Sequence, residues 1–195
     1  MIGNGYIKAS LPSLPTANIM QTGQTTSYRT GDDISRGRTV NFFTLSQKNP
    51  FGNTNRFTDM NGLQVYANGV VIDWSTLGSN NTVLLYYIGN SSTYRNWATS
   101  IDLYLSGTIA GLSVWHLWNI NEILNVVNLS YKPYKMNYAP FNFGSSSRYF
   151  FSSSDFDGTS VYITDLGGTI LGASSKTNAY FGVYVRYTTL TELGL

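Results

Sequence analysis

Short runs of β-branched and aromatic residues, separated by turn-forming residues, make up most of the chain. Segment 62–76, "GLQVYANGVVIDWST", predicts two strands joined at Asn68-Gly69, because both residues of this dipeptide tolerate the positive φ of a two-residue hairpin turn. Segment 81–90, "NTVLLYYIGN", has the composition of a third strand. Further strands are predicted in "RYFFSSS", "TSVYITDLGGTILGA" and "AYFGVYVRYTTL", which alternate apolar and polar residues between Gly, Ser and Asp-rich breaks.

Two segments between these strands have helical periodicity. In 96–107, "NWATSIDLYLSG", Asn96 or Thr93 is a candidate N-cap and Gly107 a candidate stop. In 119–128, "NINEILNVVN", Asn119 with Glu122 three positions later resembles a capping box. The apolar residues expected on one face of each helix are Trp97, Ile101, Tyr104 and Leu105 in the first, and Ile120, Ile123, Leu124 and Val127 in the second.

The order of these elements predicts the fold class. Strands, a helical pair and more strands within one chain favour an α+β fold with an irregular antiparallel sheet, two short amphipathic helices and long ordered loops. Residues 1–25 hold Leu-Pro pairs and predict an extended arm for attachment or oligomerisation, with simple terminal disorder as the alternative. Residues 26–195 then form one domain.

The loop 48–62, "KNPFGNTNRFTDMNG", has neither a helical nor a strand period. Long loops without secondary structure in small domains are usually functional or packed by their own side chains. We expect this one to be ordered and fastened by Phe51 and Phe57.

Composition excludes several functions. Charged residues are only 11% of the chain, the formal net charge is +2, and Lys and Arg form no run, so nucleic-acid binding is not expected. The chain has no cysteine, which excludes disulfides, thiolate chemistry and Cys-based zinc sites. Residues 1–20 do not resemble a signal peptide, and no apolar run is long enough for a membrane helix, so we expect no membrane insertion.

Several separate motifs resemble the Lcl-type C-terminal domain family, a C-type-lectin-like fold of bacterial surface proteins and phage tail or spike proteins. The motifs occur in the order of that family, and the resemblance covers roughly residues 22–190. They are "TGQTTSYRTGDD", "FFTLSQKNPFGNTNRFTDMNG", "YANGVVIDWST", "VWHLWNINEIL" and "NYAPFN".

The segment that enters the second helix carries the structural motif of the resemblance. Relatives have Trp-Arg-Leu-Pro-Asn followed by Glu-Leu, and the matching positions here are Trp115, Leu117, Asn119 and Glu122. His116 stands in place of the arginine and Trp118 in place of the proline, which puts in question any ion pair that the arginine makes in relatives.

Catalytic signals are weak. The single histidine, His116, lies among apolar neighbours, where a structural role is far more common than general-base catalysis. Enzymes of this fold that oxidise a substrate cysteine use cysteines of their own, which this chain lacks. In "SSSDFDGTS", Asp155 and Asp157 beside Gly158 could present oxygens to calcium, but the full spacing is missing and Asx-turn capping is favoured. We therefore expect no enzyme activity, no metal and no cofactor.

The 15 tyrosines and many Ser, Thr, Asn and Gly residues are typical of adaptable binding loops, although tyrosines can also fill the rim of a β-rich core. In C-type-lectin-like folds with variable sites, the ligand face is built from the C-terminal β-region, here 148–186. The exposed candidates there, which follow from this resemblance and the strand pattern, are Arg148, Tyr149, Asp155, Phe156, Asp157, Lys176, Asn178 and Tyr180.

The resemblance implies a phage virion protein that acts as a receptor-binding adhesin in a spike, fibre tip or tail and recognises a host glycan or other receptor. The alternatives are a capsid decoration or vertex protein of the same fold, and a bacterial surface adhesin. By analogy with phage adhesins, the arm 1–25 is expected to bind other virion proteins or to form a homotrimer.

Overall fold

The structure, a computed structural model, describes residues 42–45, 47–89, 93–103, 107–127, 140–141, 149–165 and 172–195. The expected arm 1–25 and Arg148 lie outside the described residues. The strands and helices in chain order are β1 (Phe57–Thr58), β2 (Val70–Asp73), η1 (Trp74–Thr76), β3 (Thr82–Tyr87), β4 (Arg95–Asn96), α1 (Trp97–Asp102), β5 (Thr108–Ile109), β6 (Leu112–Ser113), β7 (His116–Leu117), α2 (Ile120–Asn125), β8 (Tyr149–Asp155), β9 (Ser160–Asp165), β10 (Gly172–Ser175), β11 (Ala179–Tyr180), β12 (Tyr184–Thr189) and η2 (Thr191–Leu193).

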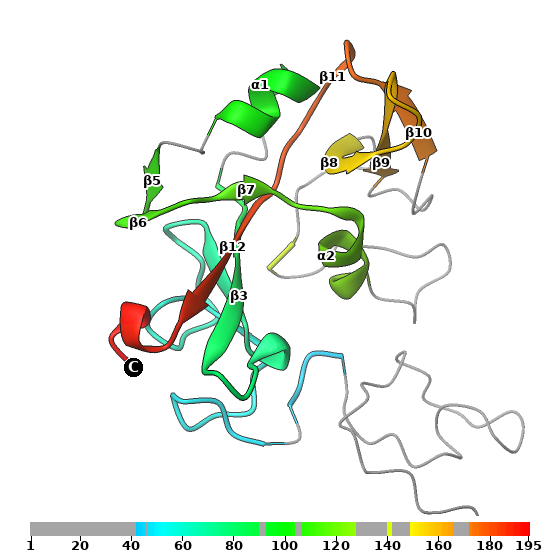
Figure 1. Cartoon of the computed structure of the whole chain (residues 1–195). Coiled ribbons are helices and arrows are strands. Elements are labelled where there is room, and N and C mark those ends of the chain that lie inside the picture. The colour runs from blue at the N-terminus through cyan, green and yellow to red at the C-terminus, as the bar shows by residue number, and fades with distance from the viewer. Residues whose placement is uncertain are drawn as a thin grey trace, which may run out of the picture.

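The main sheet has five antiparallel strands in the order β1-β2-β3-β12-β7. The last strand of the chain, β12, lies between the central strand β3 and the edge strand β7 (Figure 1). β2 and β3 are rich in β-branched residues and are buried along most of their length, as expected for strands that have neighbours on both edges.

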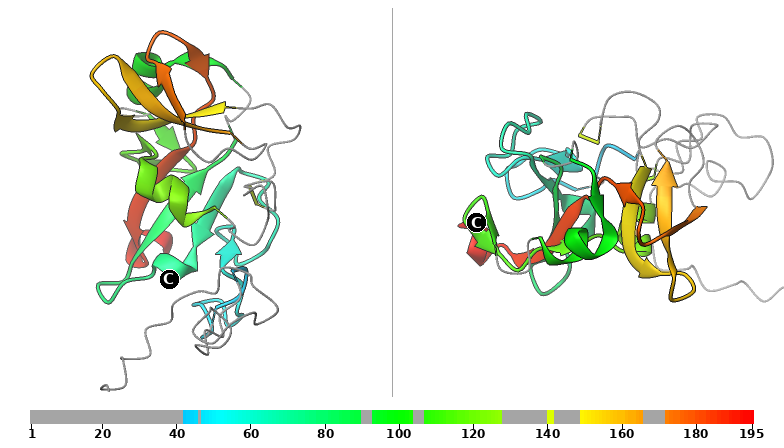
Figure 2. Two further views of the ribbon diagram at one scale, coloured as in Figure 1. Left: turned by 90° about the vertical axis from the view of Figure 1, so that its right-hand side faces the viewer. Right: turned by 90° about the horizontal axis from the view of Figure 1, so that it is seen from above.

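A second sheet of three antiparallel strands, in the order β10-β9-β8, lies at the end of the molecule away from the C-terminus (Figures 1 and 2). β8 and β9 form a hairpin whose register shifts between Phe151 and Asp155. The short strand β11 pairs with β4, next to helix α1. Antiparallel sheets with few short helices are what the α+β prediction expects, and they fit a mostly-β class as well.

Both predicted helices form, and both are shorter than expected. Helix α1 is capped by Asn96, whose side chain accepts a hydrogen bond from the Thr99 backbone N–H at 2.9 Å, so Asn96 rather than Thr93 is the cap. The helix ends at Asp102 and does not extend to Gly107. Tyr104 and Leu105 lie outside the described residues.

Helix α2 begins with the predicted capping box. The Asn119 side chain accepts from the N–H groups of Asn121 and Glu122, and Glu122 Oε2 accepts from the Asn119 N–H at 2.7 Å. The expected apolar face is wrong at one position: Leu124 is 44% exposed, and Val126 is buried in its place. The buried side of the helix is made by Glu122 and Ile123 and continues to Val126, so it is turned away from Leu124.

The hairpin predicted at Asn68-Gly69 is also wrong in its first arm. A turn does form there, with Gly69 at φ +72° and its N–H bonded to the Tyr66 carbonyl at 2.9 Å. Residues 63–67 are not a strand, because β2 pairs instead with β1. The Tyr66 hydroxyl donates to the Phe57 carbonyl at 3.1 Å, which holds this segment against the sheet in irregular form.

Loop 48–62 is ordered and packed, as predicted. Phe57 is buried, and the Phe51 ring meets the Trp74 ring edge-on with centroids 5.7 Å apart. Asn49 is also buried; its Nδ2 donates to Asn53 Oδ1 at 2.8 Å, and its Oδ1 accepts from the Phe51 N–H at 3.0 Å. Asparagine side chains thus satisfy the loop backbone where no strand partner is available.

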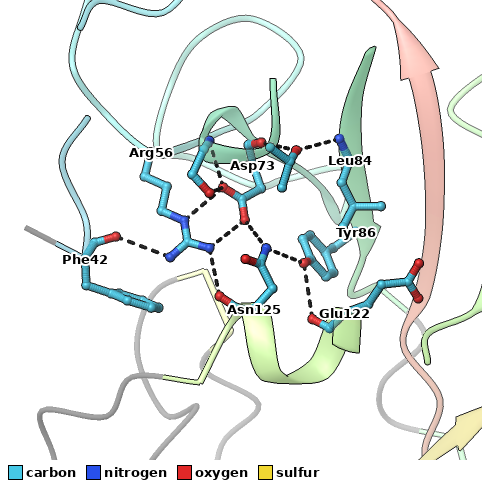
Figure 3. Close-up of polar contacts among 9 residues, drawn as sticks. Phe42, Arg56, Asp73, Leu84, Tyr86, Glu122 and Asn125 are labelled. Atoms are coloured by element: carbon cyan, nitrogen blue, oxygen red, sulfur yellow. Dashed lines mark hydrogen bonds and ion pairs between the residues drawn. The ribbon is translucent and has the colours of Figure 1, made fainter. Parts of the chain in front are cut away.

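A buried ion pair joins this loop to the main sheet (Figure 3). Arg56 Nε donates to Asp73 Oδ1 at 2.9 Å and Arg56 Nη2 to Asp73 Oδ2 at 2.7 Å, and both side chains are fully buried. The guanidinium also lies 4.5 Å from the centroids of the Phe42 and Phe57 rings. This bidentate geometry with aromatic neighbours is the one in which arginine is favoured over lysine.

The same carboxylate connects helix α2 to the sheet. Asn125 Nδ2 donates to Asp73 Oδ2 at 2.9 Å and lies 3.2 Å from the Tyr86 hydroxyl, and the Asn125 carbonyl accepts from Arg56 at 2.8 Å (Figure 3). Burial, followed by the nearby charge of Asp73, raises the pKa of Tyr86, so its phenol stays protonated and donates to the Glu122 carbonyl at 3.3 Å.

Among the described residues, no helix has the length and apolar composition that crossing a bilayer requires.

We expect Arg56→Met to lower the free energy of unfolding by about 3–5 kcal/mol, because the variant leaves the Asp73 carboxylate buried without its partner. Urea denaturation followed by tryptophan fluorescence measures the change. Lys48→Met, which removes an exposed positive charge from the same loop, is the matched control and should stay within about 0.5 kcal/mol of wild type. Equal effects of the two variants would contradict a special role for the buried pair.

We expect Asn119→Ala to lower the free energy of unfolding by about 0.5–2 kcal/mol, because two backbone N–H groups of α2 lose their acceptor. Thermal unfolding measures this loss. A melting temperature equal to that of wild type would argue against the observed helix start.

Candidate functional site

The residues predicted to form the ligand face gather at the end of the molecule built by the three-stranded sheet (Figure 1). Two connections form this end: the loop 156–159 between β8 and β9, and the turn 176–178 between β10 and β11. We refer to residues 155–160 and 176–178 as the tip. Of the predicted set, the tip contains Asp155, Phe156, Asp157, Lys176 and Asn178.

An ion pair fastens the two connections of the tip to each other. Lys176 Nζ is paired with Asp155 Oδ2 and also donates to the Gly158 carbonyl at 2.9 Å. The Lys176 backbone N–H donates to the Thr159 carbonyl at 3.1 Å. Lys176, proposed from sequence as an exposed ligand-binding group, is therefore only partly exposed and holds the tip together.

The two aspartates cap the loop between β8 and β9. Asp157 Oδ1 accepts from the N–H groups of Thr159 at 3.0 Å and Ser160 at 2.7 Å, and Asp155 Oδ1 accepts from the Gly158 N–H at 2.6 Å. These bonds lower the pKa of Asp157, first through Thr159 and then through Ser160. The Asx-turn interpretation of these residues is thus confirmed.

Phe156 lies at the apex of the capped loop and is 54% exposed. Its ring and that of Tyr162 of β9 form a T-shaped pair, with centroids 5.2 Å apart and planes at 87°. The sequence left open whether this ring stands free or folds back over the sheet. It does both, because Tyr162 supports it on one side and more than half of its surface faces solvent.

Two predicted residues lie beside the tip rather than in it. Tyr149 is 40% exposed at the start of β8. Tyr180, predicted as exposed, is instead partly buried: its ring packs between Tyr149 and Phe151, and its hydroxyl lies 3.0 Å from Ser174 Oγ. Its position on β11 directs the ring onto the second sheet, so a role in packing replaces the proposed role as an exposed anchor.

One aromatic residue of the tip region was assigned by sequence only to a helix face. Trp97, the first residue of α1, lies under Lys176, with the ammonium 4.6 Å from its ring centroid. Its indole N–H donates to the Ser152 carbonyl at 3.0 Å, and its backbone N–H to the Lys176 carbonyl at 3.3 Å. No sequence signal pairs these residues, which are far apart in the chain.

The segment before α2 packs in the core and is hydrogen-bonded to β8 through Trp118. Trp115, Leu117 and Trp118 are fully buried, and the Trp118 indole N–H donates to the Phe151 carbonyl at 2.7 Å. His116 Nε2 lies 3.2 Å from Glu122 Oε1, so within this chain the histidine is a partner of the glutamate.

Within the described part of the chain, no group of three or more His, Asp or Glu side chains lies close enough together to hold a metal ion. The tip combines an exposed aromatic ring, a side-chain amide and hydroxyl groups; Lys176 and Asp155 are paired with each other, and Asp157 is the one further charged residue. Such a surface can bind a ligand through ring contacts and hydrogen bonds.

No protein-family model matches the chain, and no curated protein is similar to it in sequence. The resemblance to the Lcl-type family therefore stays a prediction from its motifs.

The ion pair of the tip predicts a pH effect. Lys176 first, then the Gly158 N–H, lowers the pKa of Asp155 from its ordinary value of 3.8. A carboxylate with a lowered pKa in the folded state stabilises that state above its ordinary pKa, and the contribution is lost as the pH falls through the lowered value. In a carboxyl NMR titration of wild type we expect a midpoint below 3.8 for Asp155.

Lys176→Met should move this midpoint upward toward the ordinary value. Asp157 is the internal control, because its lowered pKa depends on Thr159 and Ser160 and should not respond to the substitution. An unchanged Asp155 midpoint in the variant would show that the ion pair does not form in solution.

Proposed function

We propose that the chain is a receptor-binding adhesin of a phage virion with a C-type-lectin-like fold, whose tip binds a host glycan or another surface receptor. The motifs shared with the Lcl-type family suggest this class, and the tyrosine-rich, weakly charged composition agrees with a binding surface. In this proposal the protein binds and performs no chemistry.

The observation that carries the proposal is the exposed ring of Phe156 on a loop that the Asp155–Lys176 ion pair links to the turn after β10. An exposed aromatic side chain gains free energy when binding removes it from water, and evolved interfaces concentrate binding energy in a few such anchors. The ring faces of aromatic residues also suit the C–H faces of sugars, and the amide of exposed Asn178 can bond to hydroxyl groups.

The bracing of the tip supports a recognition role in energetic terms. Asp155, Lys176 and the Gly158 carbonyl join the two connections before any ligand arrives. Association then costs less conformational entropy than it would for two independent loops. A loop that merely reversed the chain between β8 and β9 would need no link to the turn after β10.

Two other roles remain candidates within the same fold. A capsid decoration or vertex protein would use the aromatic tip against neighbouring virion proteins, and a bacterial adhesin would use it from a cell surface. In the phage hypothesis, the arm 1–25 attaches the domain to other virion proteins or to its own copies, with a homotrimer as the favoured assembly.

The proposal is tested with labelled full-length protein on a panel of bacterial strains and on a glycan array. We expect binding to a subset of strains, and the protein should block adsorption of phages that infect those strains. Phe156→Ala should weaken binding by about 5–150-fold, the effect of losing an interface anchor of about 1–3 kcal/mol, with no loss of thermal stability.

Leu63→Ala is the matched control, because Leu63 is an apolar residue of similar exposure on a loop outside the tip. It should bind as wild type does. Absence of binding to every strain and glycan would reject the adhesin role, and binding unaffected by Phe156→Ala would reject the tip as its surface. Binding to purified phage particles alone would indicate the decoration role.

A further inference from the structure

A depression of the surface lies between helix α2 and the strands β3 and β12. It is an open depression of about 340 Å³, at the small end of the roughly 300–1,000 Å³ range of ligand pockets. None of its lining residues belongs to the tip. They are Thr76, Leu84, Asn119, Asn121, Glu122, Asn125 and Tyr187.

Tyr187 forms an aromatic wall of the depression. It pairs in register with Leu84 of β3 and is 56% exposed, although it lies in the longest strand pairing of the main sheet. The His116 ring is stacked beside it, with centroids 6.4 Å apart and planes at 19°. Burial, then the charge of Glu122, raises the pKa of Tyr187, so the phenol is neutral at physiological pH.

The opposite wall carries side-chain amides with spare hydrogen-bonding capacity. The Asn119 oxygen caps α2, while its NH₂ group has no partner among the described residues. The exposed side chain of Asn121 likewise makes no hydrogen bond within the described part of the chain. Together they place donors and an acceptor in the lining of the same depression as the Tyr187 ring.

The charges at this place indicate a neutral ligand. Glu122 is the one charged residue that lines the depression, and its carboxylate is already engaged by the Asn119 N–H and by His116. The lining contains no lysine or arginine that could hold a phosphate or carboxylate. An aromatic ring with amides, and no free charge, matches the alternating C–H faces and hydroxyl groups of a sugar ring.

We propose that the depression between α2 and β12 is a binding site for a single neutral sugar ring, with Tyr187 as the stacking surface and Asn119 and Asn121 as the hydrogen-bonding groups. This site is separate from the tip and stands whether or not the tip binds a receptor. Shallow sites of this size hold such ligands weakly, with dissociation constants in the millimolar range.

The test is an NMR titration of the ¹⁵N-labelled full chain with glucose, galactose, mannose and N-acetylglucosamine at millimolar concentrations. We expect at least one sugar to shift the side-chain NH₂ signals of Asn119 and Asn121 in a saturable way. No shift with any of the four sugars, or shifts confined to residues away from the depression, would overturn the proposal.

Variants assign the binding to this site. Tyr187→Ala and Asn121→Ala should each weaken the titration at least about tenfold, while Tyr187→Phe, which keeps the ring, should retain it. Tyr94→Ala, which removes a tyrosine of similar exposure outside the depression and outside the predicted ligand face, is the matched control and should titrate as wild type.

Asn121 is exposed on the surface of α2, so its variant decides the question if Tyr187→Ala fails to fold. An unchanged titration in the folded Asn121→Ala variant would overturn the assignment. Phe156→Ala distinguishes the two proposals, because it should leave the sugar titration intact whatever it does to cell binding.

Discussion

The buried pair of Arg56 and Asp73 is the constraint on which the rest of the fold depends. Two charges without access to water are costly unless each is fully hydrogen-bonded, and breaking such a pair costs more than the pair itself contributes. Here the bonds come from four separate segments, since Phe42, Ser75 and Asn125 complete the network around the two charges. If any of these segments moved, one of the two buried charges would lose a hydrogen bond or become exposed to water.

This constraint reaches the second sheet through helix α2. Asn125 fixes the end of the helix to Asp73, and the capping box fixes its start. The segment before the helix then carries Trp118, whose indole N–H and backbone carbonyl bond to β8 at Phe151 and Ser153. The loop between β8 and β9 is therefore positioned by a continuous series of packed and hydrogen-bonded contacts that begins in the main sheet.

Local sequence patterns predicted the features that depend on neighbouring residues. They did not predict pairings between residues that are far apart in the chain. The capping box from Asn119 to Glu122 and the Asx turns at Asp155 and Asp157 are set within three residues, so they could be predicted. The partners of Arg56 and Lys176 lie 17 and 21 residues away, and nothing in the pattern pairs them. The first arm of the expected hairpin failed for the same reason, because β2 had a better partner in β1.

The distribution of charge has a consequence for recognition. With only 11% charged residues, the chain has few charges. Arg56 is paired with Asp73 in the core and Lys176 with Asp155 at the tip, which leaves Asp157 as the one further charge of the tip. Long-range steering, which raises association rates where one sign of charge dominates a surface, has little to act on here. Contact with a ligand must then depend on shape, aromatic area and short hydrogen bonds, all of which require side chains held in fixed places. Under the two proposed binding roles, affinity depends on rigidity rather than on charge, and the ion pair at the tip and the stacked rings beside α2 supply that rigidity.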